Sequence, residues 1–191
     1  MYKKLKEKFE SLSPLSTEEW NYISSLFNEV KFDKGVYITK EGQIEKWLYF
    51  TFKGGTRVFY LKNGEEHCVD FEFENEFTGD YISFLQQKPS RFYVQTLEPT
   101  IFYAISHKSL QKLYTKYKVA EKLGRLSAEN LLIKFKKRQS DLMIDNATER
   151  FINLMNNNKE WIQRVPQKYL ASFLNITPEY YSRLKKNIEL I

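Results

Sequence analysis

The chain has 191 residues, of which 42% are hydrophobic, 28% charged and 16% aromatic, and its net charge is +6. This composition is typical of one large or two small globular domains and excludes a disordered or low-complexity chain. The single cysteine, Cys68, excludes an intrachain disulfide and a cysteine-based metal site, and the two histidines, His67 and His107, are too few for a His-rich one. No apolar run approaches the ~20 residues of a membrane span, and the N-terminus lacks a signal-peptide pattern, so we expect a cytoplasmic protein.

The charge is unevenly distributed along the chain. Residues 1–115 carry 15 Lys+Arg against 16 Asp+Glu, whereas residues 116–191 carry 15 against 8. The basic excess therefore lies in the C-terminal part, which favours an anionic partner for that part.

The first predicted element is a short amphipathic helix from Ser16 to about Phe27, in which Trp20, Ile23 and Leu26 recur at helical spacing. Ser16 and Glu19 have the spacing of a capping box. From Val30 to about Ile105, frequent turn residues predict short strands of an all-β sandwich or barrel. The turn signals are Lys34-Gly35, Glu41-Gly42, Lys53-Gly54-Gly55 and Asn63-Gly64.

Two details of this β region lead to specific expectations. Asn63-Gly64 favours a type I′ hairpin, because both residues tolerate positive φ. After it, apolar Val69, Phe71 and Phe73 alternate with acidic residues, which predicts a half-buried strand with an acidic outer face. The acidic residues of the alternation are Asp70, Glu72 and Glu74.

From Ser106 onward the chain is predicted to be mostly helical, because Gly124 is its only glycine and Pro166 its first proline. Four residues at 3-4-3 spacing resemble a coiled-coil seam with one polar position, and predict a dimerisation helix. They are Leu123, Leu126, Asn130 and Ile133. The alternative is a helix that packs on the chain's own β domain. A further helix is predicted from Ala147, with a break at the polar run 156–159.

Residues 165–188 have the pattern of a helix-turn-helix. Pro166 and Pro178 suit helix starts, Thr177 suits an N-cap, and Asn175 can take the left-handed conformation of the turn, while small Ala171 lets the two helices approach closely. On the second helix the buried stripe is expected to be Tyr181, Leu184 and Ile188, and the exposed stripe Glu179, Arg183 and Lys186.

The exposed stripe predicts a base-reading surface in the major groove. Arg183 can donate to guanine, Glu179 can accept from cytosine, and Tyr180 lies beside them. The expected phosphate contacts are Gln167, Lys168, Thr177, Lys185 and Lys186. The alternative is a solvated polar face with a Glu179–Arg183 ion pair.

These motifs resemble the cyclic-AMP receptor protein/FNR family of bacterial transcription regulators over nearly the whole chain. Besides the helix-turn-helix, the supporting segments are Leu12-Ser13, Phe77-Thr78-Gly79-Asp80, Arg125-Leu126-Ser127-Ala128 and Ala147-Thr148-Glu149-Arg150. The family's base-reading Glu and Arg, four residues apart, match Glu179 and Arg183. Where its best-known member has a further base-reading Arg, this chain has Pro178, so a different preferred DNA site is expected.

The resemblance implies an α+β fold: an N-terminal double-stranded, jelly-roll-like β-roll with flanking helices, a long dimerisation helix and a C-terminal winged-helix/helix-turn-helix domain. The expected boundaries are 1–115 for the sensor, 116–141 for the dimerisation helix and 142–191 for the DNA-binding domain, with a reduced wing. The implied partners are a second copy of the chain, double-stranded DNA with an inverted-repeat operator, and RNA polymerase.

The resemblance also places an effector pocket at Gly79, Asp80, Ser90 and Arg91. Ser90 stands where the family has the arginine that pairs with the cyclic phosphate, and a strand turns the side chain of Arg91 to the opposite face. Residues 65–80 contain seven acidic residues and neither Lys nor Arg. We therefore expect weak or no binding of cyclic AMP, and the effector stays unidentified.

Two other functions were weighed. A small-ligand-binding or protein-interaction module, with a purely structural helix-turn-helix, is the alternative to a DNA-binding regulator. An enzyme is not expected, because the sequence has no nucleophile–base pair, Gly-rich phosphate loop or metal set. Cys68 and His67 are interpreted as structural residues rather than as redox or haem-binding ones, and no cofactor is assigned.

Overall fold

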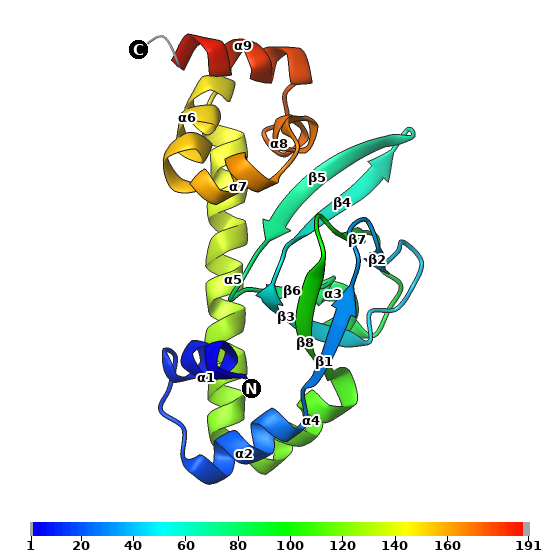
Figure 1. Cartoon of the computed structure of the whole chain (residues 1–191), viewed down its shortest axis with the longest axis vertical. Coiled ribbons are helices and arrows are strands. Elements are labelled where there is room, and N and C mark those ends of the chain that lie inside the picture. Colours follow the sequence, from blue (N-terminus) through cyan, green and yellow to red (C-terminus); the bar gives the residue numbers. More distant parts are fainter. Residues whose placement is uncertain (1, 189–191) are drawn as a thin grey trace. The chain divides into compact units, whose positions relative to one another are not determined.

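The computed structural model describes residues 2–188, so Met1 and residues 189–191 lie outside it (Figure 1). The chain divides into two compact units. The first comprises Met1–Val58 and Phe71–Asn130, and the second Phe59–Asp70 and Leu131–Ile191. Residues 59–70 group with the C-terminal unit, and a single helix, 118–144, spans the boundary at 130/131.

Within residues 2–188, eight strands form two four-stranded sheets, as the glycine-punctuated region predicted. One sheet has the order β1-β8-β3-β6 and the other β2-β7-β4-β5, and the residue pairings are antiparallel. The strands are β1 (Asn28–Phe32), β2 (Tyr37–Thr39), β3 (Trp47–Lys53), β4 (Thr56–Lys62), β5 (Glu65–Glu72), β6 (Phe77–Thr78), β7 (Tyr93–Thr96) and β8 (Thr100–Ser106). Asn63 and Gly64 both have positive φ at the turn between β4 and β5, which confirms the hairpin turn.

Strands β3 and β8 carry apolar residues on both faces, and the period-two geometry of a strand sorts these residues into two cores. Tyr49, Phe102 and Ala104 point to one side, where Ile38 of β2 joins them. The intervening Phe50, Tyr103 and Ile105 belong to a larger cluster on the other side. The two central strands therefore connect the interior of the β-roll with the helices that cover it.

Those helices are α1 (Lys3–Glu10), α2 (Thr17–Ser25), α4 (His107–Lys116) and the start of α5 (Lys118–Ile144). The capping box of α2 is confirmed, because Ser16 accepts from the Glu19 N–H and Glu19 accepts from the Ser16 N–H. Helix α1 was not predicted, although Leu5 and Phe9 are buried in the core. Gly124 of α5 has a packing role, since a Cβ there would lie only 2.3 Å from the Tyr114 hydroxyl.

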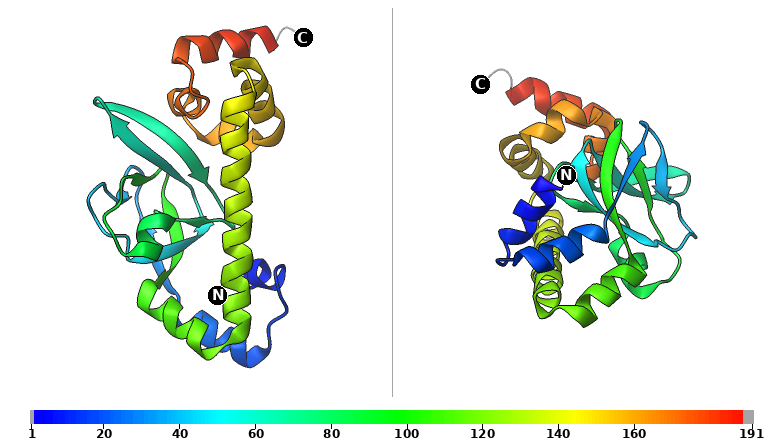
Figure 2. Two further views of the ribbon diagram at one scale, coloured as in Figure 1. Left: turned by 180° about the vertical axis from the view of Figure 1, so that it is seen from behind. Right: turned by 60° about the horizontal axis from the view of Figure 1, so that its bottom comes forward.

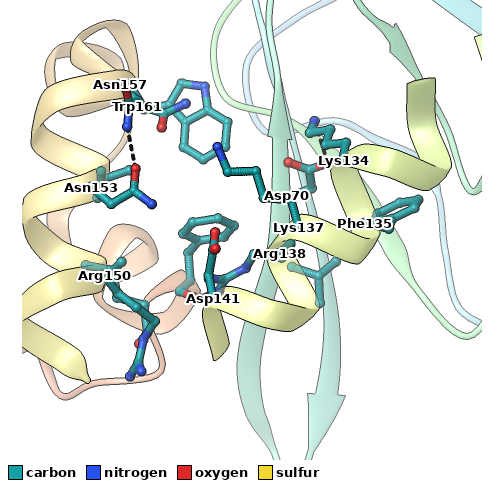
Figure 3. A pocket seen from close by; sticks show the side chains of 15 residues that line it. Asp70, Lys134, Phe135, Lys137, Arg138, Asp141, Arg150, Asn153, Asn157 and Trp161 are labelled. Carbon is teal, nitrogen blue, oxygen red and sulfur yellow. Dashed lines mark hydrogen bonds and ion pairs between the residues drawn. The ribbon is translucent and has the colours of Figure 1, made fainter. Parts of the chain in front are cut away.

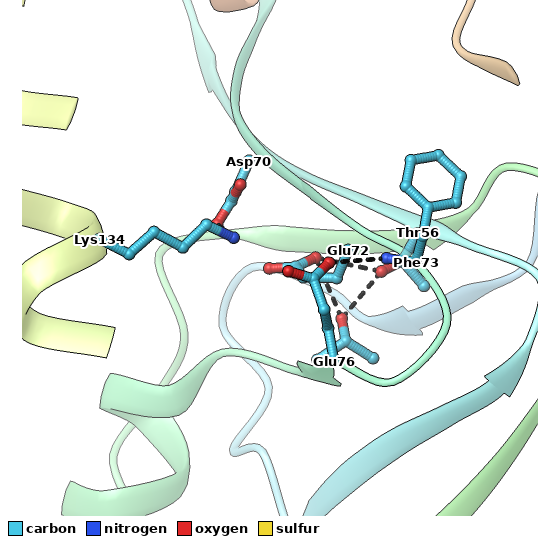
Figure 4. A network of polar contacts seen from close by, with 7 residues as sticks. Thr56, Asp70, Glu72, Phe73, Glu76 and Lys134 are labelled. Carbon is cyan, nitrogen blue, oxygen red and sulfur yellow. Dashed lines mark hydrogen bonds and ion pairs between the residues drawn. The ribbon is translucent and has the colours of Figure 1, made fainter. Parts of the chain in front are cut away.

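The predicted acidic outer face of strand β5 is wrong, because Asp70 and Glu72 are buried. Glu72 accepts hydrogen bonds from the hydroxyls of Thr56, at 3.1 Å, and Thr78, at 3.3 Å, within the first unit (Figure 4). In the second unit Asp70 pairs with Lys134 at 2.7 Å. Neighbouring elements thus cover the polar face of the strand and satisfy its carboxylates, which the alternation of residues could not reveal.

The second unit is built mainly from the end of α5 and four further helices, which lie side by side in both views of Figure 2. These are α6 (Ala147–Asn157), α7 (Lys159–Arg164), α8 (Gln167–Phe173) and α9 (Pro178–Ile188). The predicted break at the polar run is confirmed, because α6 ends at Asn157. From His107 to Ile188 the described chain has no strand, and α7 occupies most of residues 156–164, the segment in which a reduced wing was expected.

The predicted coiled-coil residues of α5 have different environments. Leu123 is only 4% exposed and belongs to the core of the first unit, so it packs within the chain. Leu126 is half-buried, Asn130 is exposed, and Ile133 is 65% exposed. Leu123 thus packs as the intrachain alternative expects, and the dimer contact stays a prediction for the more exposed residues beyond it.

Candidate nucleic-acid interface and effector site

Helices α8 and α9 are joined by a tight turn that has the predicted backbone geometry. Asn175 has φ 54°, and the N–H of Ile176 donates to the carbonyl of Ala171 at 3.1 Å. Ala171 and Leu174 are buried, so the two helices approach closely at the turn. Thr177 caps α9 by accepting from the Tyr180 N–H at 3.2 Å. Pro178 begins α9 as expected, whereas Pro166 is the N-cap of α8 rather than its first residue.

The second helix of this motif, α9, has one buried and one exposed face. Tyr181 and Leu184 are buried, and the Tyr181 ring meets Phe151 of α6 edge to face at 5.1 Å. Ile188, the third residue of the predicted stripe, lies among residues whose side chains are outside the description. Because one side of α9 is anchored to α6, its opposite side is presented outward.

That outward side carries the predicted base-reading residues. Glu179 and Arg183 are exposed and Tyr180 is half-buried. The Arg183 guanidinium lies 4.7 Å from the centre of the Tyr180 ring, a cation–π contact that restricts the arginine while leaving its edge donors accessible. Within the described part of the chain, Arg183 makes this contact and no ion pair with Glu179. The expected Glu179–Arg183 ion pair is therefore not formed, and a solvated polar face remains the alternative to a base-reading surface.

Glu179 lies in the first turn of α9, where the partial positive charge of the helix terminus favours a carboxylate. Hydrogen bonds from its own backbone N–H and from the Thr177 hydroxyl lower the pKa of Glu179 below its usual value. This side chain is thus held ionised, as an acceptor.

The residues predicted to contact phosphates lie around the same motif. Gln167 and Lys168 open α8 and are exposed, and the ammonium of Lys168 lies 4.8 Å from the centre of the Tyr169 ring. Lys186 is exposed and Lys185 half-buried near the end of α9. Thr177 is exposed at the N-cap of α9.

Two arginines that support the helix-turn-helix turn were missed in the sequence. Arg138 of α5 donates to the carbonyl of Phe173, and Arg150 of α6 donates from Nε to the carbonyl of Leu174 at 3.1 Å. Both carbonyls lie at the C-terminal end of α8, where the helix dipole favours cations. Their separation along the chain from α8 left no local signal for this role.

Ser172 of α8 was also missed. Its hydroxyl accepts from the Cys68 N–H at 2.9 Å and donates to the Glu66 carbonyl at 3.1 Å. A single side chain thus ties the first helix of the motif to the backbone of strand β5, and Cys68 itself is buried there, as its structural interpretation predicted.

In the first unit, the predicted effector pocket residues Asp80 and Ser90 contact each other. Asp80 caps α3 (Tyr81–Gln86), and its Oδ1 accepts from the N–H groups of Ile82 and Ser83. Its Oδ2 accepts from the Ser90 hydroxyl at 2.6 Å. Both side chains are buried, whereas Arg91 is exposed. Ser90, at the position where the family has its phosphate arginine, is thus hydrogen-bonded to a carboxylate of the same chain.

Glu45, which the sequence reasoning missed, adds a second buried carboxylate beside Gly79. A Cβ on Gly79, whose φ is 126°, would lie 3.5 Å from the carboxylate of Glu45. Burial raises the pKa of Glu45, partly offset by hydrogen bonds from the Thr39 hydroxyl and from backbone N–H groups. The only hint in the sequence is an acidic residue between the apolar Ile44 and Trp47. Two buried carboxyl groups thus lie at the predicted effector pocket, and an ionised carboxylate repels an anion.

Comparison with known proteins supports the assignment of the fold. Residues 29–117 match the family model described as the cyclic nucleotide-binding domain. A search of curated proteins finds no match in sequence. Many solved structures are similar to the chain.

The c-di-GMP-responsive global regulator CLP of Xanthomonas campestris has a TM-score of 0.71 and 15% identity, with 92% of each chain covered. FixK2 of Bradyrhizobium japonicum has a TM-score of 0.71 and 18% identity, over 86% of this chain and 85% of FixK2. The catabolite activator protein of Thermus thermophilus has a TM-score of 0.56 and 18% identity, over 93% of this chain and 85% of the other. At these identities the likeness concerns the fold: the chain has the fold of such regulators, with a cyclic nucleotide-binding-type β-roll, the long helix α5 and a helical C-terminal unit.

No helix within residues 2–188 combines the length and the apolar character that a bilayer crossing requires.

Proposed function

We propose that this protein is a sequence-specific DNA-binding transcription regulator of the cyclic-AMP receptor protein/FNR type, acting as a homodimer. The observation that carries the proposal is the exposed face of α9, on which Glu179, Tyr180 and Arg183 lie opposite the anchored Tyr181 and Leu184. The similarity of the fold to CLP and FixK2 supports it, as does the basic excess of residues 116–191.

In this proposal α9 enters the major groove. Arg183 donates two hydrogen bonds to guanine O6 and N7, and Glu179 accepts from cytosine N4. The contact with the Tyr180 ring limits the rotamers of Arg183 before binding, which reduces the entropy lost on recognition. Gln167, Lys168, Thr177, Lys185 and Lys186 contact phosphates and set the register of the helix.

The proposed dimer contact lies on the part of α5 beyond Asn130, where Leu132, Ile133 and Phe135 are exposed. Two-fold symmetry would present two copies of α9 to half-sites about one helical turn apart, so the operator is expected to be an inverted repeat. As a regulator the dimer would act with RNA polymerase at the promoters that carry this operator.

The test begins with selection of the preferred sites from a pool of random DNA duplexes by the full-length protein. Arg183→Ala should then weaken binding to the selected duplex by ~1–3 kcal/mol and relax specificity at one base pair of each half-site. Lys159→Ala, which removes an exposed positive charge from α7, is the matched control and should keep the specificity. Unchanged affinity of Arg183→Ala would overturn the residue assignment, and failure to select any sequence would favour the ligand-binding or interaction module.

The β-roll is proposed not to take cyclic AMP, because the Ser90–Asp80 contact replaces an arginine–phosphate pair. Calorimetric titration of the full-length protein with cyclic AMP and cyclic GMP should give no binding at micromolar concentrations. Micromolar binding of either nucleotide would overturn this part of the proposal.

A further inference from the structure

The second unit contains a cavity of about 280 Å³, and none of the residues that line it belongs to α9 (Figure 3). Its walls come from the end of β5, from α5 and α6, from Trp161 of α7 and from the end of α8. This volume is near the lower end of the range of small-molecule sites, which favours a ligand with a single ring.

One wall of the cavity is aromatic. The rings of Trp161 and Phe173 meet edge to face, with their centres 5.2 Å apart. The Arg138 guanidinium lies 3.8 Å from the centre of the Phe173 ring. Such a wall offers π surface to an aromatic ring and is already organised before a ligand arrives.

The charge of the lining is positive. Lys134 is paired with Asp70, which leaves Lys137, Arg138 and Arg150 against the carboxylate of Asp141. Within the described residues, Lys137 and Asp141 make no side-chain ion pair or hydrogen bond. Burial, followed by repulsion from Arg150, lowers the pKa of Arg138 to about 10. An anion in the cavity would relieve this repulsion.

The cationic groups also have hydrogen-bond capacity left. In the described part of the chain, Arg138 uses one terminal nitrogen for the Phe173 carbonyl, although a guanidinium has five N–H donors. Asn157 donates to the side-chain oxygen of Asn153. The side-chain oxygen of Asn157 therefore stays available as an acceptor, and the side-chain NH₂ of Asn153 as a donor. Figure 3 shows Lys137, Asp141, Asn153 and Trp161 around the same space.

We propose that this cavity binds a small aromatic anion, a single ring that carries a carboxylate or phosphate group. The ring would lie against Trp161 and Phe173, and the anionic group would be near Lys137 and Arg138. The proposal does not depend on DNA binding, because the cavity, its charge and its aromatic wall are features of the second unit by themselves.

The experiment uses the indole N–H signals of the full-length protein in nitrogen-15 NMR spectra, with Trp161→Phe to assign the signal of Trp161 among the three tryptophans. Phenyl phosphate and benzoate are the probes, and the tighter of the two identifies the anionic group. Inorganic phosphate lacks the ring, benzyl alcohol lacks the charge, and benzylamine has the opposite charge. We expect saturable shifts of the Trp161 signal with phenyl phosphate or benzoate, and binding at least ~10-fold weaker with the other three.

Two charge variants test the assignment further. Lys137→Gln should weaken binding of the better probe by about threefold, and Asp141→Asn should strengthen it by about threefold, as partly exposed charges affect binding modestly. Lys136→Gln removes the same charge from the neighbouring exposed position, which does not line the cavity, and should leave binding unchanged.

The proposal would be overturned if neither aromatic anion shifted the Trp161 signal. Tighter binding of benzylamine, weaker binding by Asp141→Asn, or equal effects of Lys136→Gln and Lys137→Gln would each overturn it too. The unfolding midpoint of every variant is compared with that of the parent protein, so that a loss of binding is scored only in folded protein.

Discussion

The Ser90 hydroxyl donates a hydrogen bond of 2.6 Å to a carboxylate oxygen of Asp80, and both side chains are buried. The same hydroxyl accepts from the Phe92 N–H at 2.9 Å, so it links the cap of α3 to the segment that leads into β7. The contact connects two segments that, in the family the chain resembles, flank the cyclic phosphate. In this chain the two segments are joined to each other by the Ser90 hydrogen bonds, which favours a structural role for Ser90.

Ser90→Ala should reduce the free energy of unfolding by about 1–3 kcal/mol, because it leaves a buried carboxylate oxygen and a partly buried N–H without this partner. Urea unfolding of the full-length protein measures the change. Ser24→Ala is the matched control, since that exposed hydroxyl only donates to the Asn21 carbonyl, and should change stability by less than about 0.5 kcal/mol. Equal effects of the two variants would contradict the structural role.

The buried Glu45 makes stability depend on pH. Its pKa in the folded protein is raised above 4.5 by burial, so the folded state binds the proton more tightly than the unfolded state. Stability should therefore fall as the pH rises from about 4.5 through the higher pKa of the folded state. Urea unfolding midpoints from acid to neutral pH should show this loss in the parent protein, and a smaller one in Glu45→Gln. A parallel pH profile for the two proteins would contradict the prediction.

The turn of the helix-turn-helix needs a residue that tolerates positive φ. Asn175→Val should reduce stability by about 1–2 kcal/mol, because a β-branched residue is strained in the left-handed region. Asn175→Gly, the matched substitution, should keep or slightly raise stability, since glycine adopts this conformation readily. Thermal unfolding distinguishes the two, and a larger loss for Gly than for Val would mean that the Asn side chain, and not the backbone conformation, matters.

The exposed part of α5 is the predicted dimer contact. Ile133→Glu should weaken self-association about 100-fold or more, because two-fold symmetry removes two buried isoleucines and places two carboxylates in an apolar contact. Light scattering after size-exclusion chromatography measures the mass. Gln139→Glu adds the same charge at another exposed position of α5 and should remain dimeric. A dimer of Ile133→Glu would place the contact elsewhere.

Local patterns in the sequence predicted the elements whose geometry is decided within a few residues. The Ser16–Glu19 capping box, the Asn63-Gly64 turn and the Asn175 turn are confirmed because each depends on short-range hydrogen bonds or on the φ preference of one residue. The separation of exposed Arg183 from buried Tyr181 follows from the period of a helix that is anchored on one side.

Other features were decided by tertiary structure, because periodicity shows that two faces differ without showing what covers each. Asp70 and Glu72 were expected to face solvent, and they are buried because Lys134 and the hydroxyls of Thr56 and Thr78 satisfy them. Leu123 fits a seam by spacing, but the core of the first unit covers it.

The charge excess of the C-terminal part was visible at once in the sequence, and it indicated an anionic partner. Tertiary structure decided where the individual charged side chains of this part lie. It brought Arg138 and Arg150 to the carbonyls at the end of α8 and beside a cavity, and it left Arg183 exposed on α9. These positions depend on contacts between residues 24 or more apart in the chain, and no local pattern of residues encodes such contacts.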